Sequence, residues 1–278
     1  MRRPPTDGCL EAMLTYERSG PTGSTPILLL HAGIADRRMW DSVWPTLTAG
    51  RDVVRVDLRG FGDSTERPAG PWSPRADVGA TLDALGVERA HVVGCSFGAG
   101  VAVELALERP AAVASLVLAA PGGSLITERT EELAAFWELE GKAVEAGDLD
   151  GAAEANVVAW VDGPHRGPDV VPAAVRDAVR TMQRRAFELT IGWPDEVWEA
   201  EEELSPEPPE RLDEVAVPTL VISGELDIDA IRLAADHLLT GVREVRAVVW
   251  PDVAHVPSME RPDDFAAQVL DWVSRAEE

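Results

Sequence analysis

A serine set between small residues is the first feature of this chain able to do chemistry. Residues 94–98 read Gly-Cys-Ser-Phe-Gly, between an apolar run at 90–93 and an alanine- and valine-rich stretch at 99–107. The G-x-S-x-G spacing is typical of a sharp strand-to-helix turn, which lifts the serine hydroxyl clear of the sheet and leaves room only for small neighbours. The sequence therefore predicts Ser96 as a nucleophile. Cys95 is predicted to be a small buried apolar residue.

A serine hydroxyl needs a histidine base, and that histidine needs a carboxylate to fix its tautomer. Of five histidines, only His255 follows the last apolar run. The acid is expected in the loop after the preceding apolar run, where Asp227 stands three residues past a glycine. Asp229 suits the N-cap of the next helix and remains the alternative, since a loop position is not fixed to within two residues. Glu225 is expected to make turn or cap contacts.

The oxyanion of an acyl-transfer reaction needs hydrogen-bond donors that are fixed in advance. One donor is expected from the amide after the nucleophile, Phe97, and another from the loop after the early apolar run, at Gly33. Glycine permits the backbone conformation that turns this N–H toward the nucleophile. Ile34 is the alternative donor, and His31 is interpreted as a structural residue of the same loop.

The composition limits the protein's class and its partners. A length of 278 residues with 45% hydrophobic content is enough for one large core. The formal charge of −24 disfavours nucleic acid and anionic membranes as partners. The first residues lack a signal-peptide pattern, no stretch is apolar enough to span a membrane, and two cysteines make no disulfide framework. A cytoplasmic protein that acts on a small molecule is expected, and a homo-oligomer is left open.

The chemistry-bearing residues need elements that bring them to one edge of a sheet. Apolar runs of strand length alternate with helical stretches, which predicts an α/β fold with a mainly parallel, doubly wound sheet. The expected strands are 12–18, 26–31, 52–58, 90–95, 113–120, 218–223 and 245–250. The expected helices are 37–47, 75–85, 99–108, 231–239 and 262–275.

Residues 122–212 interrupt this alternation and are predicted to form an inserted helical cap, called the cap segment below. Proline and glycine mark both of its ends, and no strand pattern lies within it. The core domain is then expected at 1–121 and 213–278. The tryptophans of the cap segment are expected mostly in its core, with one or two above Ser96; they are Trp137, Trp160, Trp193 and Trp198. The arginines at 129, 166, 180, 184 and 185 are expected to be solvated or paired with glutamate, and binding of a substrate carboxylate is the alternative.

Taken together, these residues resemble the α/β-hydrolase fold superfamily along the whole chain outside the cap segment. Four segments are similar to that family's motifs. They are the G-x-S-x-G turn at 94–98, the apolar run into His31-Ala32-Gly33, the turn at 57–64 and the Glu-Arg-Pro run at 260–262. The usual His-Gly pair of the oxyanion loop is His31-Ala32 here. The run Met39-Trp40-Asp41 and the modest helical cap are similar to 3-oxoadipate enol-lactonases and small esterases.

The resemblance implies a serine hydrolase that cleaves an ester or lactone of a small, largely apolar substrate through an acyl-enzyme. An acyltransferase, a carbon–carbon bond hydrolase and a cofactor-free haloperoxidase-like enzyme share the triad and stay open. A ligand-binding protein without catalysis is the remaining alternative, and the intact Ser96, Asp227 and His255 set argues against it. No metal or cofactor is expected, because zincin, C-x-x-C and dinucleotide-binding motifs are missing from the sequence.

Overall fold

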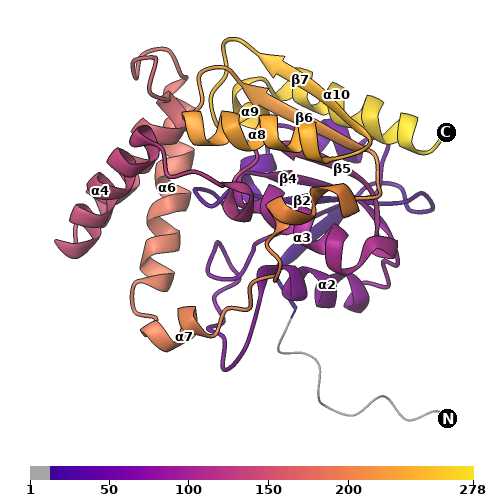
Figure 1. The fold of residues 1–278 in the computed structure, drawn as a ribbon, viewed down its shortest axis with the longest axis horizontal. Helices are drawn as coiled ribbons and strands as arrows, with labels where there is room; N and C mark the ends of the chain where they lie inside the picture. The colour runs from indigo at the N-terminus through magenta and orange to yellow at the C-terminus, as the bar shows by residue number, and fades with distance from the viewer. Residues whose placement is uncertain (1–12) are drawn as a thin grey trace.

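The computed structural model describes residues 13–278, and their strands form one mainly parallel sheet with helices on both faces (Figure 1). Within these residues the strand order is β1-β3-β2-β4-β5-β6-β7, with β1 antiparallel to β3 and the other neighbours parallel. The strands are β1 Tyr16–Ser19, β2 Ile27–Leu30, β3 Val53–Val56, β4 Ala90–Cys95, β5 Val113–Ala119, β6 Thr219–Gly224 and β7 Val245–Trp250. The α/β class and the parallel sheet expected from the sequence are confirmed. The first residue of the expected strand at 12–18 lies outside the described residues.

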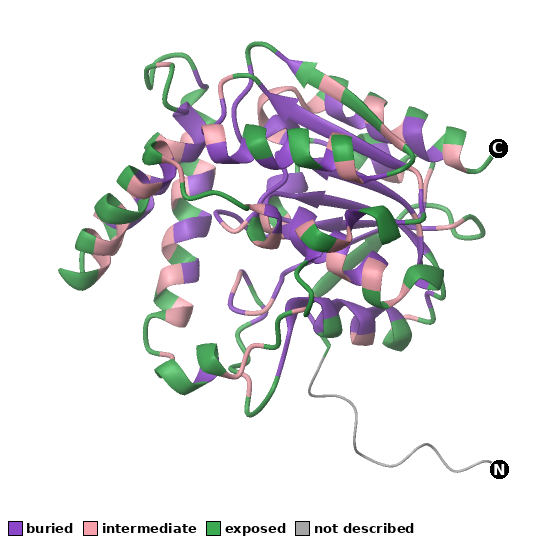
Figure 2. Ribbon diagram, in the orientation of Figure 1, coloured by how far each residue is buried: buried purple, intermediate pink, exposed green. Residues whose placement is uncertain are grey.

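The central strands are buried on both faces, which explains their continuous apolar sequence. In β2, Ile27 and Leu29 pack into one apolar cluster, whereas Leu28 and Leu30 pack into a second cluster on the opposite face. Helices α2, α3 and α8 cover the second cluster, and α1 and α10 cover the first. Figure 2 shows the central strands as buried and the outward sides of the covering helices as exposed, whereas the edge strands β1 and β7 are largely exposed.

The helices of the core are α1 Trp44–Thr48, α2 Pro74–Ala84, α3 Phe97–Glu108, α8 Asp229–Gly241, α9 Pro257–Glu260 and α10 Pro262–Ala276. Two short 3-10 turns are η1 Arg37–Trp40 and η2 Pro110–Ala112. The helix expected at 37–47 is wrong as one element, because η1 ends before α1 begins. The physical reason is Pro45, which has no N–H to donate to residue 41 and whose ring would clash with that carbonyl.

Helical elements fill the connection between β5 and β6. They are η3 Gly123–Leu125, α4 Glu131–Glu145, α5 Leu149–Asn156, the π-helical η4 Val157–Asp162, α6 Ala173–Thr190, α7 Asp195–Glu199 and η5 Pro208–Glu214. Helices α4, α6 and α7 stand at one side of the sheet (Figure 1). The predicted end of the cap segment, residue 212, falls inside η5. The division into a core domain and a cap segment stays a prediction.

The tryptophans of the cap segment differ in burial. Trp160 is buried, but Trp137 and Trp198 are 43% and 45% exposed, so the expectation of a core position is wrong for these two. Elsewhere, Cys95 is a free buried thiol, and Cys9 lies outside the described residues. Among residues 13–278, no helix combines the length and apolar character that crossing a bilayer requires.

Candidate active site

Ser96 occupies the turn between β4 and α3 in a strained backbone conformation. Its φ of 53° and ψ of −115° lie where a residue with a side chain is rarely found. Such strain costs about 1–3 kcal/mol and persists only where the surroundings enforce it. Here the Ser96 N–H donates to Ala119 O at 2.9 Å, and its carbonyl accepts from Ala99 N at 2.8 Å. The turn is therefore held from the neighbouring strand and from the new helix.

The glycines on either side of Ser96 are required by close backbone contacts. A Cβ on Gly94 would lie 2.2 Å from Gly98 O, and a Cβ on Gly98 would lie 2.4 Å from Leu30 O. Neither position admits a side chain without moving backbone atoms. The G-x-S-x-G pattern thus reflects the packing of the turn against itself and against β2.

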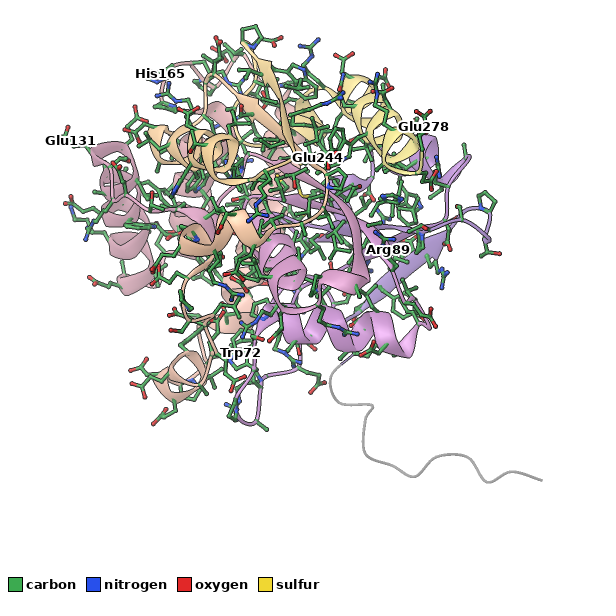
Figure 3. The ribbon with its side chains drawn as sticks, turned by 45° about the vertical axis from the view of Figure 1, so that its right-hand side comes forward. Trp72, Arg89, Glu131, His165, Glu244 and Glu278 are labelled. Atoms are coloured by element: carbon green, nitrogen blue, oxygen red, sulfur yellow. The ribbon has the colours of Figure 1, made fainter. Side chains whose placement is uncertain are left out.

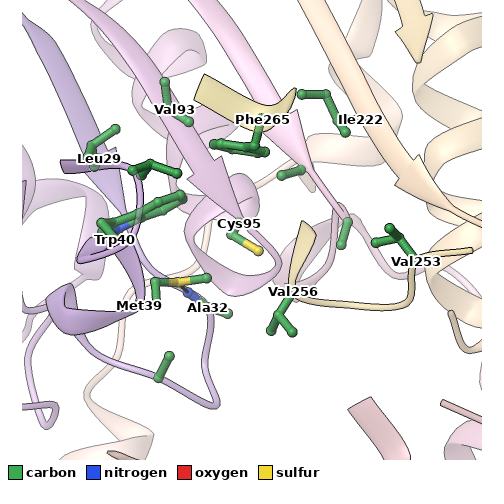
Figure 4. Packing of buried hydrophobic residues seen from close by; sticks show 14 of the residues in the cluster. Leu29, Ala32, Met39, Trp40, Val93, Cys95, Ile222, Val253, Val256 and Phe265 are labelled. Carbon is green, nitrogen blue, oxygen red and sulfur yellow. Dashed lines mark hydrogen bonds between the residues drawn. The ribbon is translucent and has the colours of Figure 1, made fainter. Parts of the chain in front are cut away.

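Cys95 faces the apolar interior, as the sequence predicts. Figure 4 shows its side chain among Ala32, Met39 and Val256. Burial, and to a lesser degree the Asp227 carboxylate, raise the pKa of the thiol well above its usual range. A thiol in these surroundings stays protonated and unreactive. Its Sγ donates to His255 O at 3.6 Å, so the loop of His255 lies against the end of β4.

His255 and Asp227 are brought together. The His255 Nδ1 and Asp227 Oδ2 atoms are 2.8 Å apart, and both side chains are 1% exposed. The other carboxylate oxygen, Oδ1, accepts from Ile228 N at 2.8 Å. A carboxylate at Nδ1 keeps the proton on that nitrogen, and Nε2 is then free to act as a base.

The relation of Ser96 to His255 is less direct than that of His255 to Asp227. Ser96 is 9% exposed, and His255 follows β7 on a neighbouring loop. Among the hydrogen bonds of residues 13–278, none joins Ser96 Oγ directly to His255. Catalytic hydrogen bonds are often long without substrate and tighten in the complex. The base remains a prediction for His255, supported by its bond to Asp227.

The alternative acid, Asp229, is engaged elsewhere. Its Oδ1 accepts from Ala230 N at 2.8 Å at the start of α8, and its own N–H donates to Glu132 Oε2 at 2.9 Å. Asp229 is the first residue of α8, and the N-cap expected at Asp229 is Ile228 instead, with no side-chain cap bond. The geometry favours Asp227 as the partner of His255.

The expected oxyanion donors lie against each other. A Cβ on Gly33 would lie 3.4 Å from Phe97 Cβ, so the two residues are in contact range. Within the described residues, the amides of Gly33, Ile34 and Phe97 donate no hydrogen bond to the protein. Three free N–H groups are therefore available near Ser96, and the choice between Gly33 and Ile34 stays a prediction.

The other histidines have separate surroundings. His31 Nε2 accepts from Leu58 N at 2.9 Å and Nδ1 donates to Ala32 O at 2.8 Å, which fits its expected structural role. Burial lowers the pKa of His31 and of His91. His165 is 46% exposed, and His237 lies on the exposed side of α8.

The sequence predicts one or two of the four cap tryptophans above Ser96 without saying which, and it gives no role to Gly122. Trp160 of η4 packs its ring 4.4 Å from the His255 ring, centroid to centroid, and its carbonyl accepts from His255 N at 3.3 Å. On the other side, a Cβ on Gly122 would lie 3.0 Å from Ser96 Oγ and 3.1 Å from Ile231 Cδ1. Trp160 carries no local pattern in the sequence. Gly122 belongs to the Pro-Gly-Gly run that was noticed only as a boundary.

Most arginines of the cap segment are paired with acids, whereas Arg129 lies over the Trp137 ring. A cavity of about 450 Å³ lies between α6 and the loop after β3. Its lining residues are Arg37, Arg38, Gly62, Asp63, Arg180, Thr181, Arg184, Arg185 and Glu188. Arg180 bonds Glu154 and Asp177, and Arg184 bonds Asp150 and Glu188. Because carboxylates already neutralise these guanidinium groups, the cavity is a poor site for an anionic substrate group.

Comparison with known proteins gives a consistent picture. Residues 25–262 match the alpha/beta hydrolase fold family. A pimeloyl-[acyl-carrier protein] methyl ester esterase of Neisseria meningitidis serogroup C is 29% identical over 264 residues, covering 92% of this chain and 96% of that protein. A 2-hydroxymuconate semialdehyde hydrolase of Pseudomonas sp. (strain CF600) is 40% identical over 121 residues, which span 40% of this chain and 41% of that protein.

Solved structures show the same fold. The enol-lactonase from Burkholderia xenovorans LB400 superposes with a TM-score of 0.74 at 24% identity, covering 94% of this chain and 96% of that one. A hydrolase from Pseudomonas aeruginosa PA01 gives a TM-score of 0.74 at 26% identity, with 93% of both chains covered.

Proposed function

Because this chain belongs to the alpha/beta hydrolase fold family, we propose that it is a serine hydrolase that cleaves a carboxylic ester or lactone through an acyl-enzyme on Ser96. That the chain is an enzyme of the hydrolase class follows from its relatives. The serine mechanism and the substrate are the proposal. The observation that carries it is the buried 2.8 Å contact between His255 Nδ1 and Asp227 Oδ2, on the loops next to the strained Ser96 turn.

The proposed reaction begins with attack of Ser96 Oγ on the substrate carbonyl carbon, while His255 Nε2 takes the hydroxyl proton. The carbonyl oxygen becomes an oxyanion that accepts hydrogen bonds from the Phe97 and Gly33 amides. The tetrahedral intermediate then collapses, and the leaving alkoxide takes the proton from His255. Water repeats the sequence on the acyl-enzyme, which releases the acid and restores the Ser96 hydroxyl.

The surroundings of Ser96 support a small, largely apolar substrate. Ser96 Oγ and Ile231 Cδ1 both lie within 3.1 Å of the position of a Cβ on Gly122, and Trp160 packs on His255 and on Phe136. The esterase and enol-lactonase among the similar proteins act, by their names, on an ester and a lactone. Ester or lactone cleavage is therefore preferred over other reactions of the same triad.

A second candidate is cleavage of a carbon–carbon bond. It is favoured by the 40% identity to the 2-hydroxymuconate semialdehyde hydrolase, although that match spans less than half of either protein. Transfer of the acyl group to an alcohol or amine in place of water is the third possibility, and it would use the same acyl-enzyme.

One experiment separates these reactions. The protein and its Ser96→Ala variant are given aryl esters, lactones and 2-hydroxymuconate semialdehyde, with and without added alcohols or amines. We expect rapid release of phenol from the esters, an acylated Ser96 by mass spectrometry after rapid quenching, and water as the acceptor. Turnover only of the semialdehyde would support the second candidate. Equal turnover by the Ser96→Ala variant would contradict the serine mechanism.

We also propose that the chain works on small molecules in the cytoplasm without nucleic acid or membrane as a partner. The charge of −24 supports this, because the field of the protein repels phosphate groups. Its oligomeric state is left open. A filter-binding assay with double-stranded DNA and sedimentation with anionic vesicles test the proposal, with no association expected in either.

A further inference from the structure

Arg166 and Glu260 form a buried ion pair between the cap segment and the loop of His255. Arg166 Nη2 and Glu260 Oε2 are 2.5 Å apart, and the two side chains are 6% and 7% exposed. Arg166 follows η4, one residue after His165, which Figure 3 labels in the loop at the top of the molecule. Glu260 is the last residue of α9, just after the His255 loop. The pair therefore joins segments separated by almost a hundred residues.

On its cap side, the arginine binds the end of η4. Its Nε donates to Asp162 O at 2.6 Å, and Nη2 donates to Val161 O at 2.6 Å. The last carbonyls of a helix have no partner within it and need donors from elsewhere. Arg166 supplies two of these donors directly beside Trp160, whose ring packs on His255.

On the other side, the same pair holds the loop before His255. Arg166 Nη1 donates to Asp252 O at 2.9 Å. Glu260 Oε1 accepts from Ala254 N at 3.1 Å, directly next to the histidine. Burial raises the pKa of Glu260, and the charge of Arg166 opposes that rise. The polar groups of the pair are thus directed at each other and at residues within three positions of Trp160 or His255.

A buried ion pair adds little net stability, because the cost of removing both charges from water offsets their attraction. What such a pair does achieve is one fixed arrangement of the groups it contacts. Here those groups belong to the two segments that carry Trp160 and His255. The backbone bond from His255 N to Trp160 O, at 3.3 Å, closes the connection between the same segments.

We propose that Arg166 and Glu260 are positioning residues that lock the η4 end of the cap segment to the His255 loop, so that the cap and the imidazole hold their catalytic geometry together. This inference rests on the proposed role of His255 as the base. A displacement of about 1 Å in a catalytic group can lower turnover about 100-fold. Loss of the pair is therefore expected to lower kcat more than it raises KM.

The test compares Arg166→Ala, Glu260→Gln and the double variant with the parent enzyme on an aryl ester. We expect Arg166→Ala to lower kcat about 10- to 100-fold with KM changed less than about threefold. Glu260→Gln keeps an oxygen for Ala254 N, so it should lose less. Because the two residues act as one unit, the double variant should be no slower than Arg166→Ala.

A readout independent of activity comes from NMR of the imidazole Nδ1–H of His255, assigned with a His255→Gln variant. Its bond to Asp227 should protect this proton from exchange with water in the parent and expose it in Arg166→Ala. The matched control is Arg18→Ala, which breaks the bidentate pair between Arg18 of β1 and Asp52, the residue before β3, away from the His255 loop.

The outcomes are distinct. An unchanged Nδ1–H signal in Glu260→Gln and Arg166→Ala, with kcat no lower than in Arg18→Ala, would overturn the positioning role. Additive losses in the double variant would overturn the coupling. If Arg166→Ala does not fold, Glu260→Gln carries both measurements. Failure of the parent enzyme to cleave esters through Ser96 would refute the proposed function instead, and the NMR signal still decides whether the pair positions His255.

Discussion

Replacing Asp227 by asparagine changes one buried contact and leaves the shape of the site intact. In the native protein, Oδ2 lies 2.8 Å from His255 Nδ1, and Oδ1 accepts from Ile228 N at 2.8 Å. Asparagine keeps an oxygen for Ile228 N. Its NH₂ group then faces Nδ1. Because the NH₂ group donates, Nδ1 must accept, and the imidazole proton moves to Nε2. A histidine protonated at Nε2 cannot take the proton of Ser96.

The expected loss follows from this change of tautomer. In serine triads, the same substitution lowers kcat about 10⁴-fold. At about 1.36 kcal/mol for each factor of ten, the Asp227→Asn variant should lose about 5.4 kcal/mol of transition-state stabilisation. The Asp227 carboxylate is 1% exposed and is therefore not expected to contact substrate, so KM should change little. Folding should be retained because the replacement has the same shape.

The assay is steady-state hydrolysis of an aryl ester by Asp227→Asn, with Asp229→Asn as the matched control. Asp229 bonds only the start of α8 and Glu132, and an amide oxygen can still accept from Ala230 N. We expect the control to keep kcat within about threefold of the parent. If Asp227→Asn retains more than about a tenth of the parent turnover, or if Asp229→Asn loses as much, the assigned acid is wrong.

Three further predictions concern the surroundings of the site. Gly98→Ala places a Cβ 2.4 Å from Leu30 O, so the free energy of unfolding in urea should fall by about 1–3 kcal/mol or more; an unchanged value refutes the packing argument. Cys95→Ala should keep kcat within about tenfold, and native Cys95 should resist iodoacetamide; rapid alkylation contradicts its burial. Because burial lowers the pKa of His31, only the unfolded chain takes up this proton, so stability should fall as the pH drops below about 6.5, and His31→Asn should flatten that slope.

Local patterns were enough to predict the sheet and the turn at Ser96. The strands at 90–95 and 245–250 begin and end where the sequence places them, because apolar runs bounded by turn residues leave few alternatives. Gly94 and Gly98 are set by backbone contacts at short range, so their spacing carries the information. The order of Ser96, Asp227 and His255 along the chain then limits the acid and the base to two loops.

Contacts between distant segments could not be predicted in this way. Trp160 lies against His255 although the two are far apart in the sequence, and nothing near residue 160 specifies that contact. The sequence predicts that Arg166 is solvated or paired. It does not identify Glu260 as the partner, although the proposed positioning role depends on that pair. Pro45 marks the break between η1 and α1 in the sequence. The apolar pattern continues through it, so that pattern alone predicts one helix.

The most direct test of the account is labelling of the native protein with a fluorophosphonate, which reacts only with an activated serine. We predict one phosphonyl group per chain, located on Ser96 by peptide mass spectrometry, with labelling abolished in Ser96→Ala and strongly slowed in His255→Ala. A native protein that stays unlabelled while an esterase control reacts, or that is labelled equally well without Ser96, would contradict the central claim that His255 and Asp227 activate this serine.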